Sequence, residues 1–165
     1  SAAKRLAVGP GSMHWPRRVP SELFRANCPA ISSRNCCRNT CPMSKSIRTL
    51  DEVFSRYIRR RDCPNGIGRC ISCGALISYD TCDAGHYIGR AHTATRWNET
   101  NVHAQCRICN RHKYGNLKAY RRRLVELYGV EAVEELERMK HLTVCLHEKD
   151  YRELIEYYKI KLNRL

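Results

Sequence analysis

The sequence contains no run of 18 or more apolar residues, so we expect no transmembrane helix. It also lacks a charged start that leads into an apolar stretch and a small-residue cleavage site, so we expect no secretory signal. Acidic residues are scarce, with 16 Asp and Glu against 30 Lys and Arg, and the net charge is +14. This excess predicts a polyanionic partner, with nucleic acid as the first candidate and an acidic membrane surface as the second.

Cysteine, in contrast, is abundant, with 11 residues in a chain of 165. Disulfides explain this number poorly in a chain without an export signal, because the cytosol keeps thiols reduced. The odd count also fits badly with a closed set of disulfides. We therefore expect a cytoplasmic protein in which some of the cysteines bind zinc.

The charge is unevenly distributed along the chain, with +6 in residues 1–42, +10 in residues 43–123 and −2 in residues 124–165. The middle part is the expected contact surface. Residues 1–42 contain several prolines and glycines and no sustained periodicity, and Met43 begins a stretch that looks like a natural start. We expect a disordered or non-native leader over 1–42, followed by one domain over 43–165.

Hydrophobic periodicity predicts an α+β fold for that domain. Apolar residues at helical spacing predict a helix that starts near Thr49, where Thr49 and Glu52 match a capping box, and ends before Pro64. Two short stretches rich in β-branched and aromatic residues, 75–88 and 100–105, predict a hairpin with a long connection. We expect this N-terminal helix to flank the core that contains the hairpin.

The C-terminal part of the chain shows three apolar stripes at helical spacing. We expect one helix from Leu117 that Gly129 closes, a second over 130–139, and a third over 151–165 with Thr143 as its cap. Stripes of this kind usually form core, so we assign this region a packing role.

Two CxxC pairs, separated by 32 residues, give the clearest chemical signal. They are Cys70 with Cys73 and Cys106 with Cys109. Zinc takes four thiolates in tetrahedral geometry, and each CxxC turn supplies two of them. Two such pairs favour zinc over a redox motif or free thiols. Because four cysteines leave no open coordination position, the predicted zinc is structural, and its binding free energy contributes to folding.

Between and just after these pairs lie His86, Asn101 and Asn110. A histidine at a strand end, an asparagine that opens the next strand and an asparagine at a helix start form the pattern of a ββα-metal, or HNH, nuclease site. Such a site needs a neutral imidazole as general base, a group that orients it, and a divalent cation at the phosphate. The simpler alternative for His86 is a packed or surface histidine.

Residues 44–165 resemble the lambdoid phage NinG, or Rap, family of recombination proteins. This family implies a structure-specific endonuclease that uses Mg²⁺ or Mn²⁺ to cut branched recombination intermediates such as Holliday junctions and D-loops. The resemblance covers about three quarters of the chain. The matching stretches are Cys70-Ile-Ser-Cys73-Gly74, Asp83-Ala-Gly-His-Tyr87, Asn98-Glu99, Asn101-Val-His103, Gln105-Cys106, Cys109-Asn110, His112-Lys113 and Gly115-Asn116-Leu117.

The resemblance implies that His86 is the general base, that Asn101 orients it and that Asn110 binds the catalytic cation. The second cation ligand stays open, because Gly85 occupies the position at which many HNH sites carry an aspartate. Asp83 is the nearest carboxylate, although three residues along a strand point it to the opposite face from His86. His103 is a ligand, a phosphate contact or a packed histidine.

DNA contact is expected from Lys and Arg side chains that displace counterions from the phosphate backbone. We expect some of them to form only a solvated surface. Trp97 either stacks on an unpaired base or packs under its loop. The predicted contacts are Arg90, Arg96, Arg107, Arg111, Lys113, Lys118, Arg121, Arg122 and Arg123.

The sequence thus predicts an N-terminal helix and linker over 43–69, a zinc-stapled HNH core over 70–116 and a helical unit over 117–165. We expect a phage- or prophage-encoded DNA endonuclease in the bacterial cytoplasm, at the nucleoid. Symmetric resolution of a junction needs two active sites, so a homodimer through the C-terminal helices is a further hypothesis. The alternatives are an HNH nuclease for restriction, homing or packaging, and an inactive zinc-dependent DNA-binding accessory protein.

Overall fold

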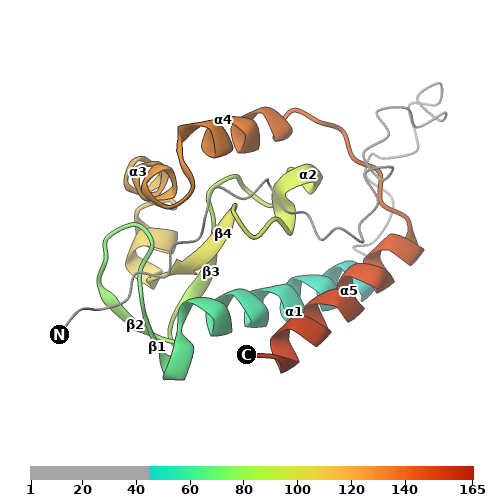
Figure 1. The fold of residues 1–165 in the computed structure, drawn as a ribbon, viewed down its shortest axis with the longest axis horizontal. Helices are drawn as coiled ribbons and strands as arrows, with labels where there is room; N and C mark the ends of the chain where they lie inside the picture. Colours follow the sequence, from blue (N-terminus) through green and yellow to red (C-terminus); the bar gives the residue numbers. More distant parts are fainter. Residues whose placement is uncertain (1–44) are drawn as a thin grey trace.

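The computed structural model describes residues 45–165 and has the predicted α+β class (Figure 1). The predicted leader over 1–42 lies outside the described residues. No helix within 45–165 is both long and apolar enough to cross a bilayer. The elements are α1 (Lys45–Asp62), η3 (Pro64–Gly66), β1 (Ile67–Arg69), β2 (Leu76–Ser78), β3 (Asp83–His86), α2 (Thr93–Arg96), β4 (Val102–Gln105), η4 (Ile108–His112), α3 (Leu117–Tyr128), α4 (Val130–Met139) and α5 (Glu148–Asn163).

Two antiparallel hairpins form the β structure. β3 pairs with β4 in regular register, from Asp83 opposite Gln105 to His86 opposite Val102, which confirms the predicted hairpin with a long connection. β1 pairs with β2 in a second hairpin that the sequence did not predict. Its strands have three residues each, which is too short for an alternating pattern to be recognised.

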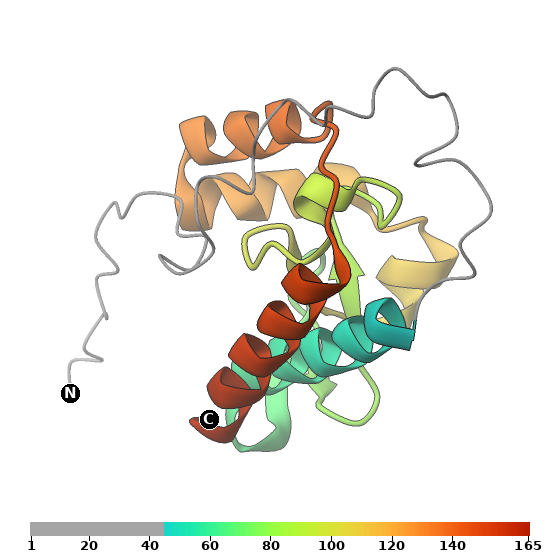
Figure 2. The ribbon, with the colours of Figure 1, turned by 90° about the vertical axis from the view of Figure 1, so that its right-hand side faces the viewer.

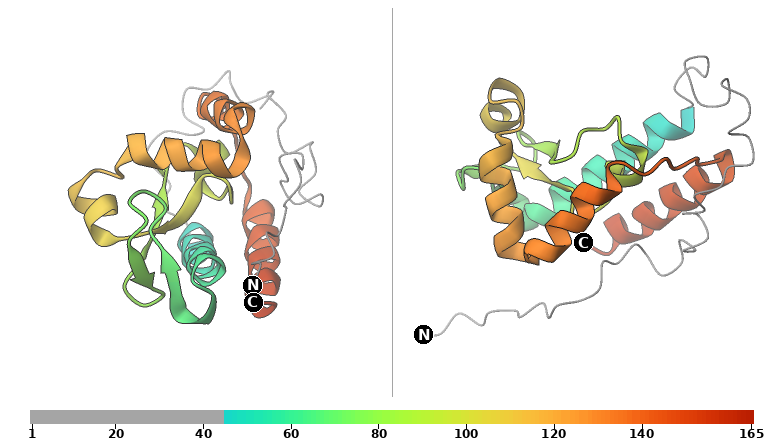
Figure 3. Two further views of the ribbon diagram at one scale, coloured as in Figure 1. Left: turned by 60° about the vertical axis from the view of Figure 1, so that its left-hand side comes forward. Right: turned by 90° about the horizontal axis from the view of Figure 1, so that it is seen from above.

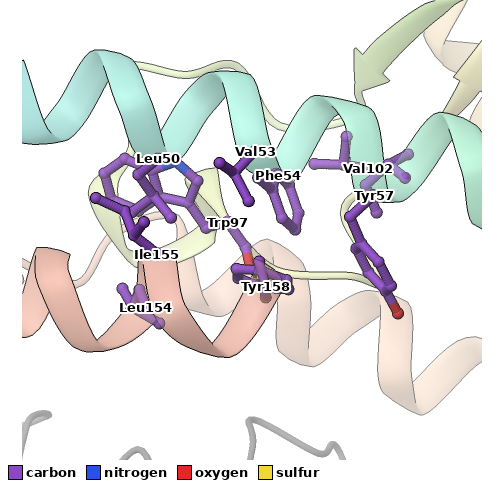
Figure 4. Packing of buried hydrophobic residues seen from close by; sticks show 10 residues of the cluster. Leu50, Val53, Phe54, Tyr57, Trp97, Val102, Leu154, Ile155 and Tyr158 are labelled. Atoms are coloured by element: carbon purple, nitrogen blue, oxygen red, sulfur yellow. Dashed lines mark hydrogen bonds between the residues drawn. The ribbon is translucent and has the colours of Figure 1, made fainter. Parts of the chain in front are cut away.

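The main apolar core lies between α1 and α5, which run side by side under the β3–β4 hairpin (Figures 1 and 2). Phe54 of α1 and Tyr158 of α5 meet edge to face, with ring centroids 4.7 Å apart. Trp97 inserts its ring between the two helices and is 2 % exposed (Figure 4). Burial stabilises each such side chain by about 1.5–3 kcal/mol.

A second apolar cluster holds α3 and α4 together on the other side of the hairpin (Figures 1 and 2). Tyr120 and Leu124 of α3 pack there with Val133 and Leu136 of α4. The predicted helical unit over 117–165 is therefore divided, because α5 leaves α3 and α4 and packs on α1. Since α1 covers the apolar stripe of α5, that stripe is used within the chain, which weakens the homodimer hypothesis based on it.

The helix termini confirm one expectation and correct two. Gly129 ends α3 with φ +87°, a conformation that L side chains rarely adopt. α1 begins at Lys45, so Thr49 lies inside the helix and its hydroxyl donates to the Lys45 carbonyl at 3.0 Å. α5 begins at Glu148, because the His147 N–H donates to the Asp150 carboxylate at 2.7 Å. The predicted caps at Thr49 and Thr143 were wrong.

Candidate functional site

The four cysteines predicted to bind zinc meet at one point. Cys70 and Cys73 lie on the turn between β1 and β2, Cys106 follows β4, and Cys109 lies in η4. Their sulfur atoms all lie within 4.8 Å of one another, and the Cys73 and Cys106 sulfurs are 3.8 Å apart. Tetrahedral zinc with bonds of about 2.3 Å needs sulfurs about 3.8 Å apart. The structure therefore confirms a cluster that can hold a metal such as zinc.

Local backbone geometry prepares this cluster for thiolates. Gly74 adopts φ +74° and donates its N–H to the Cys70 carbonyl at 2.8 Å, which closes the first turn. In the second turn the Cys109 N–H points at the Cys106 sulfur at 3.4 Å, and the Asn116 amide donates to the Cys109 sulfur at 3.4 Å. Such donors favour the charged form of sulfur, which is the form that binds metal.

His86 ends β3, and its ring is anchored to the loop that follows. Its Nε2 lies 3.0 Å from the Arg96 carbonyl oxygen. A carbonyl only accepts, so Nε2 carries the hydrogen in this arrangement and Nδ1 is free to take a proton. Burial lowers the pKa of His86 to about 4, against the opposing effect of this hydrogen bond. The imidazole is therefore neutral at pH 7.

Asn101 ties the loop from residue 88 to residue 95 to the start of β4. Its amide nitrogen donates to the carbonyls of Ile88 and Thr95, both at 2.9 Å, and its oxygen accepts from the Ile88 N–H at 2.7 Å. Asn101 is fully buried, and its side-chain hydrogen bonds within residues 45–165 go to Ile88 and Thr95 rather than to His86. Ile88 lies two residues after His86, and Thr95 directly precedes Arg96. Asn101 therefore holds the backbone next to both partners of the hydrogen bond between His86 and Arg96.

A second clasp on the same loop comes from α1, and sequence reasoning missed it. Asp51 accepts two hydrogen bonds from Arg96, at 2.5 and 3.1 Å, and one from the Trp97 indole at 2.9 Å. These contacts join residues about 45 positions apart, so no local pattern in the sequence signals them. Arg96, a predicted DNA contact, is thereby committed to a structural ion pair.

Asp83 and Asn110 meet at the other end of β3. The Asn110 amide donates to the Asp83 carboxylate at 3.0 Å, and Arg111 donates to both carboxylate oxygens at 2.8 and 2.9 Å. Burial alone would raise the pKa of Asp83, but the hydrogen bonds from Arg111 and Asn110 outweigh it and lower that pKa. The regular register of β3 points Asp83 and His86 to opposite faces of the hairpin.

Gly85 shares the Asp83 face and cannot carry a side chain in this arrangement. A Cβ built there would lie 2.2 Å from Gln105 Oε1. Gln105 is fully buried, and its amide nitrogen donates to Ser72 at 2.7 Å and to the Gly115 carbonyl at 2.6 Å. Gln105 thus joins the first cysteine turn to the turn after η4. It occupies the space that an aspartate at residue 85 would need.

His103, predicted as a candidate cation ligand, is a packed histidine in the structure. Its Nε2 lies 2.8 Å from the Tyr128 hydroxyl, its Nδ1 lies 3.4 Å from the Tyr120 hydroxyl, and the residue is 5 % exposed. Burial, and to a smaller extent the nearby Arg61, lower the pKa of His103 to about 3. With both ring nitrogens at tyrosine hydroxyls, neither faces a cation.

The nine predicted DNA contacts divide into two groups. Besides Arg96 and Arg111, Arg121 pairs with Glu137 at 2.8 Å and Arg123 pairs with Glu126 at 2.7 Å. The pairs of Arg111, Arg121 and Arg123 are partly solvated and therefore weak. The other five side chains are exposed and form no ion pair within residues 45–165: Arg90, Arg107, Lys113, Lys118 and Arg122.

Of the aromatic residues, Tyr114 rather than Trp97 is open to a ligand. Trp97 packs under its loop, which is the second of its two predicted roles, and its buried ring offers no face to a base. Tyr114 is 89 % exposed and has φ +48°, a strained conformation for a residue with a side chain. The Gly115 N–H donates to the carbonyls of Cys109 and Asn110, which holds this turn in place. The missed signal was an aromatic next to Lys113.

The chain is similar to phage proteins named "Protein ninG". It is 44 % identical over 97 residues to the one from Escherichia phage lambda, 43 % to the one from Salmonella phage P22 and 42 % to the one from Enterobacteria phage H19B. These alignments cover 58 % of this chain and 46 % of the relatives, so the chain spans about half their length. No solved structure matches the chain.

A family model described as "Bacteriophage Lambda NinG protein" matches residues 32–165. The match extends over the whole described fold, including the four-cysteine cluster and the His86 and Asp83 ends of β3. It also begins upstream of Met43. The resemblance inferred from the sequence is therefore confirmed, and the chain belongs to the NinG family.

Proposed function

We propose that this protein is a metal-dependent DNA endonuclease of the ββα-metal, or HNH, type that cuts branched recombination intermediates. One observation carries the proposal: a neutral histidine at the end of β3, anchored through Nε2, lies next to a loop that the polar contacts of Asn101 and Asp51 hold in place. A hairpin followed by a short helical turn is the arrangement that this chemistry uses. Holliday junctions and D-loops are the proposed substrates.

His86 is the proposed general base. Its Nδ1 takes a proton from water, the resulting hydroxide attacks phosphorus, and the bond from phosphorus to the 3′ oxygen breaks. The leaving oxygen then takes a proton from solvent. A phosphodiester brought next to the ring favours the imidazolium, so substrate binding raises the pKa of His86 above its value of about 4 and makes it a stronger base.

Asp83 and Asn110 are the residues that would hold a catalytic Mg²⁺ or Mn²⁺, because hard divalent cations prefer carboxylate and amide oxygens. A catalytic cation stabilises the charge that develops on the phosphate and on the leaving oxygen. Asp83 and His86 point to opposite faces of the hairpin, so in this arrangement a cation at Asp83 would be held away from the phosphate next to His86. In this structure Arg111, rather than a cation, neutralises Asp83. The Arg111 side chain is 58 % exposed, so it can move away when a cation binds. Its guanidinium is then available to a phosphate oxygen.

The DNA backbone is proposed to lie on the exposed cations of the loop, η4 and α3. Lys113 follows η4 within one turn of Asn110, and we assign it to a phosphate close to the cut. Tyr114 replaces Trp97 as the candidate for stacking on an unpaired base. These contacts carry little base information, so we expect recognition of DNA shape rather than of sequence.

The family supports a place in phage biology, since the relatives are phage proteins named ninG. We propose that the protein acts on recombining phage DNA in the cytoplasm of the bacterial host, at the nucleoid. Whether two copies act together on a junction is tested by light scattering with and without junction DNA. A single copy in both conditions removes the homodimer hypothesis.

The testing experiment compares cleavage of a four-way junction and of a linear duplex in Mg²⁺ by the wild type and by His86→Ala. We expect the wild type to prefer the junction, and His86→Ala to lose at least about 100-fold in rate while it retains zinc and junction binding. His92→Ala is the matched control, because His92 lies on the same loop and, within residues 45–165, its ring forms a hydrogen bond only with the Lys140 carbonyl. Full cleavage by His86→Ala overturns the proposal.

A second candidate function rests on Gly85 and Arg111. With no carboxylate at residue 85, and with Asp83 already neutralised, the chain has the features of a zinc-dependent DNA-binding accessory protein that does not cut. The same assay separates the two, since this alternative predicts junction binding without nicking at any Mg²⁺ or Mn²⁺ concentration.

A further inference from the structure

Three large aliphatic side chains lie exposed around one groove beside the cysteine cluster. Ile67 is 63 % exposed, Leu76 70 % and Ile108 60 %. They line a groove of about 500 Å³ between the β1–β2 hairpin and η4, together with the buried Ile77 and the charged Arg107. Isolated exposed aliphatic residues are ordinary, but a contiguous patch of them marks a binding surface.

The register of the β1–β2 hairpin explains why these side chains face outwards. Gly68 lies opposite Ile77, and Ile77 packs inwards against Cys63 and Cys82. Because side chains alternate, the other face carries Ile67 and Leu76. Arg69 is on that same face, directly opposite Leu76. The exposed face is therefore apolar with a cation beside it.

The charge around the groove points to a polyanion. The segment 106–123, which supplies Ile108, carries seven Lys and Arg residues and no Asp or Glu. A second copy of this chain would bring Arg69 and Arg107 of both copies together, which like-charge repulsion opposes. An acidic ligand that also offers a flat apolar surface satisfies both the cations and the aliphatic side chains.

DNA offers such a surface only where base stacking is interrupted. A continuous duplex hides the faces of its base pairs, whereas a branch point exposes them, and proteins use Ile and Leu side chains as wedges against base steps. We propose that Ile67, Leu76 and Ile108 form a wedge that packs against the exposed base pair at a DNA branch. This inference rests on the proposed function, since it assumes that DNA is the ligand.

The position of the groove suits this role. Arg107 lines the groove and is also close enough to Asp83 to help lower its pKa. The wedge and the Asp83–Asn110 pair therefore border each other across η4. A branch point seated on the wedge brings the adjoining phosphates to the face of η4 that carries Asn110.

The test measures binding in the His86→Ala background, so that no DNA is cut. The DNAs are a four-way junction and a linear duplex of the same sequence, each with 2-aminopurine at the central base pair. We expect Leu76→Ser and Ile67→Ser each to weaken junction binding about tenfold, the effect of leaving one large aliphatic side chain unburied. The change in 2-aminopurine fluorescence on junction binding should also become smaller in these variants. Their affinity for the linear duplex should change by less than about twofold.

Ile160→Ser is the matched control, because Ile160 is 51 % exposed on α5, on the opposite side of α1 from the β1–β2 hairpin (Figure 3, left). It should change neither affinity. Zinc content and thermal melting check that each variant folds. The wedge is refuted if both DNAs lose affinity equally, if junction preference is unchanged, or if Leu76→Ser converts a dimer into a monomer.

Failure of the wedge and failure of the proposed function give different results. If the wild type cuts junctions and Leu76→Ser keeps the same preference for junctions over duplex, only the wedge proposal is refuted. If the wild type cuts no DNA but its preference for binding junctions depends on Leu76, the nuclease proposal is refuted and the wedge proposal stands.

Discussion

The two sides of the β3–β4 hairpin are stabilised by different interactions. The side facing α1 and α5 is packed with aromatic and aliphatic side chains such as Phe54, Trp97 and Tyr158. The other side combines the apolar cluster of α3 and α4 with four cysteines and with polar contacts around Asp83 and Gln105. The two apolar clusters can form without a metal, whereas the cysteine cluster has few large apolar neighbours that could replace one.

This difference explains the arrangement of the candidate site. His86 belongs to the side of α1 and α5, where burial keeps its ring neutral and two clasps fix the loop. Asp83 and Asn110 belong to the side of the four cysteines, where η4 is held by Cys106 and Cys109. The proposed base therefore depends on the packing of α1, and the proposed cation ligands depend on the four-cysteine cluster.

The largest expected effect is loss of the metal. Cys106→Ser should release zinc and unfold the β1–β2 hairpin and η4, because structural zinc contributes about 10 kcal/mol or more of binding free energy to such folds. Circular dichroism should show that α1 and α5 retain helix. Cys145→Ser, outside the cluster, should retain zinc. Cooperative melting of Cys106→Ser at the wild-type temperature would contradict this division.

The reverse test acts on the side of α1 and α5. Trp97→Ala should lower the free energy of unfolding by about 3–5 kcal/mol, because it leaves a cavity between α1 and α5 and removes the bond to Asp51. Urea unfolding measures this loss, and zinc content in the folded protein should stay at one ion per chain. The division into two separately stabilised sides would be contradicted if Trp97→Ala lost zinc while the stability of α1 and α5 stayed at the wild-type value.

A smaller effect is expected at the loop that joins the sides. Asn101→Ala should cost about 3 kcal/mol, since it removes three hydrogen bonds and leaves buried backbone groups of Ile88 and Thr95 unpaired. Hydrogen exchange should increase within residues 88–101. Protection equal to that of the wild type would show that Asn101 is not needed to order the loop around His86.

The smallest effect per residue is the dependence of stability on pH. Burial lowers the pKa of His86 to about 4 and that of His103 to about 3, below the unfolded value of about 6.5. Above pH 6.5 both are neutral in either state, and their contribution is fully present. As the pH falls below 6.5 the unfolded chain binds protons that the folded chain refuses, so each costs about 1.4 kcal/mol per pH unit.

Urea unfolding between pH 7 and pH 5 measures this slope. His103→Gln should reduce it by the contribution of one histidine, and zinc content at each pH separates this effect from loss of the metal. An unchanged slope in His103→Gln would show that His103 is not held neutral by burial.

Much of the fold was predictable because its signals are local. The helical spacing of apolar residues predicted α1, α3, α4 and α5, and two stretches rich in β-branched and aromatic residues predicted the β3–β4 hairpin. Helix starts were predicted less well, because Thr49 bonds back to Lys45 instead of capping a terminus. The β1–β2 hairpin was missed, since strands of three residues show no pattern of their own.

By itself, the sequence determined the family, the α+β class and the four cysteines that can bind zinc, because each depends on residue identity and spacing along the chain. Only the tertiary structure decided which polar residues work together. It paired Asn110 with Asp83, enclosed His103 between two tyrosines, and committed Arg96 to Asp51. These contacts join residues 17 to 45 positions apart, and they form because packing of helices on the hairpin brings them together.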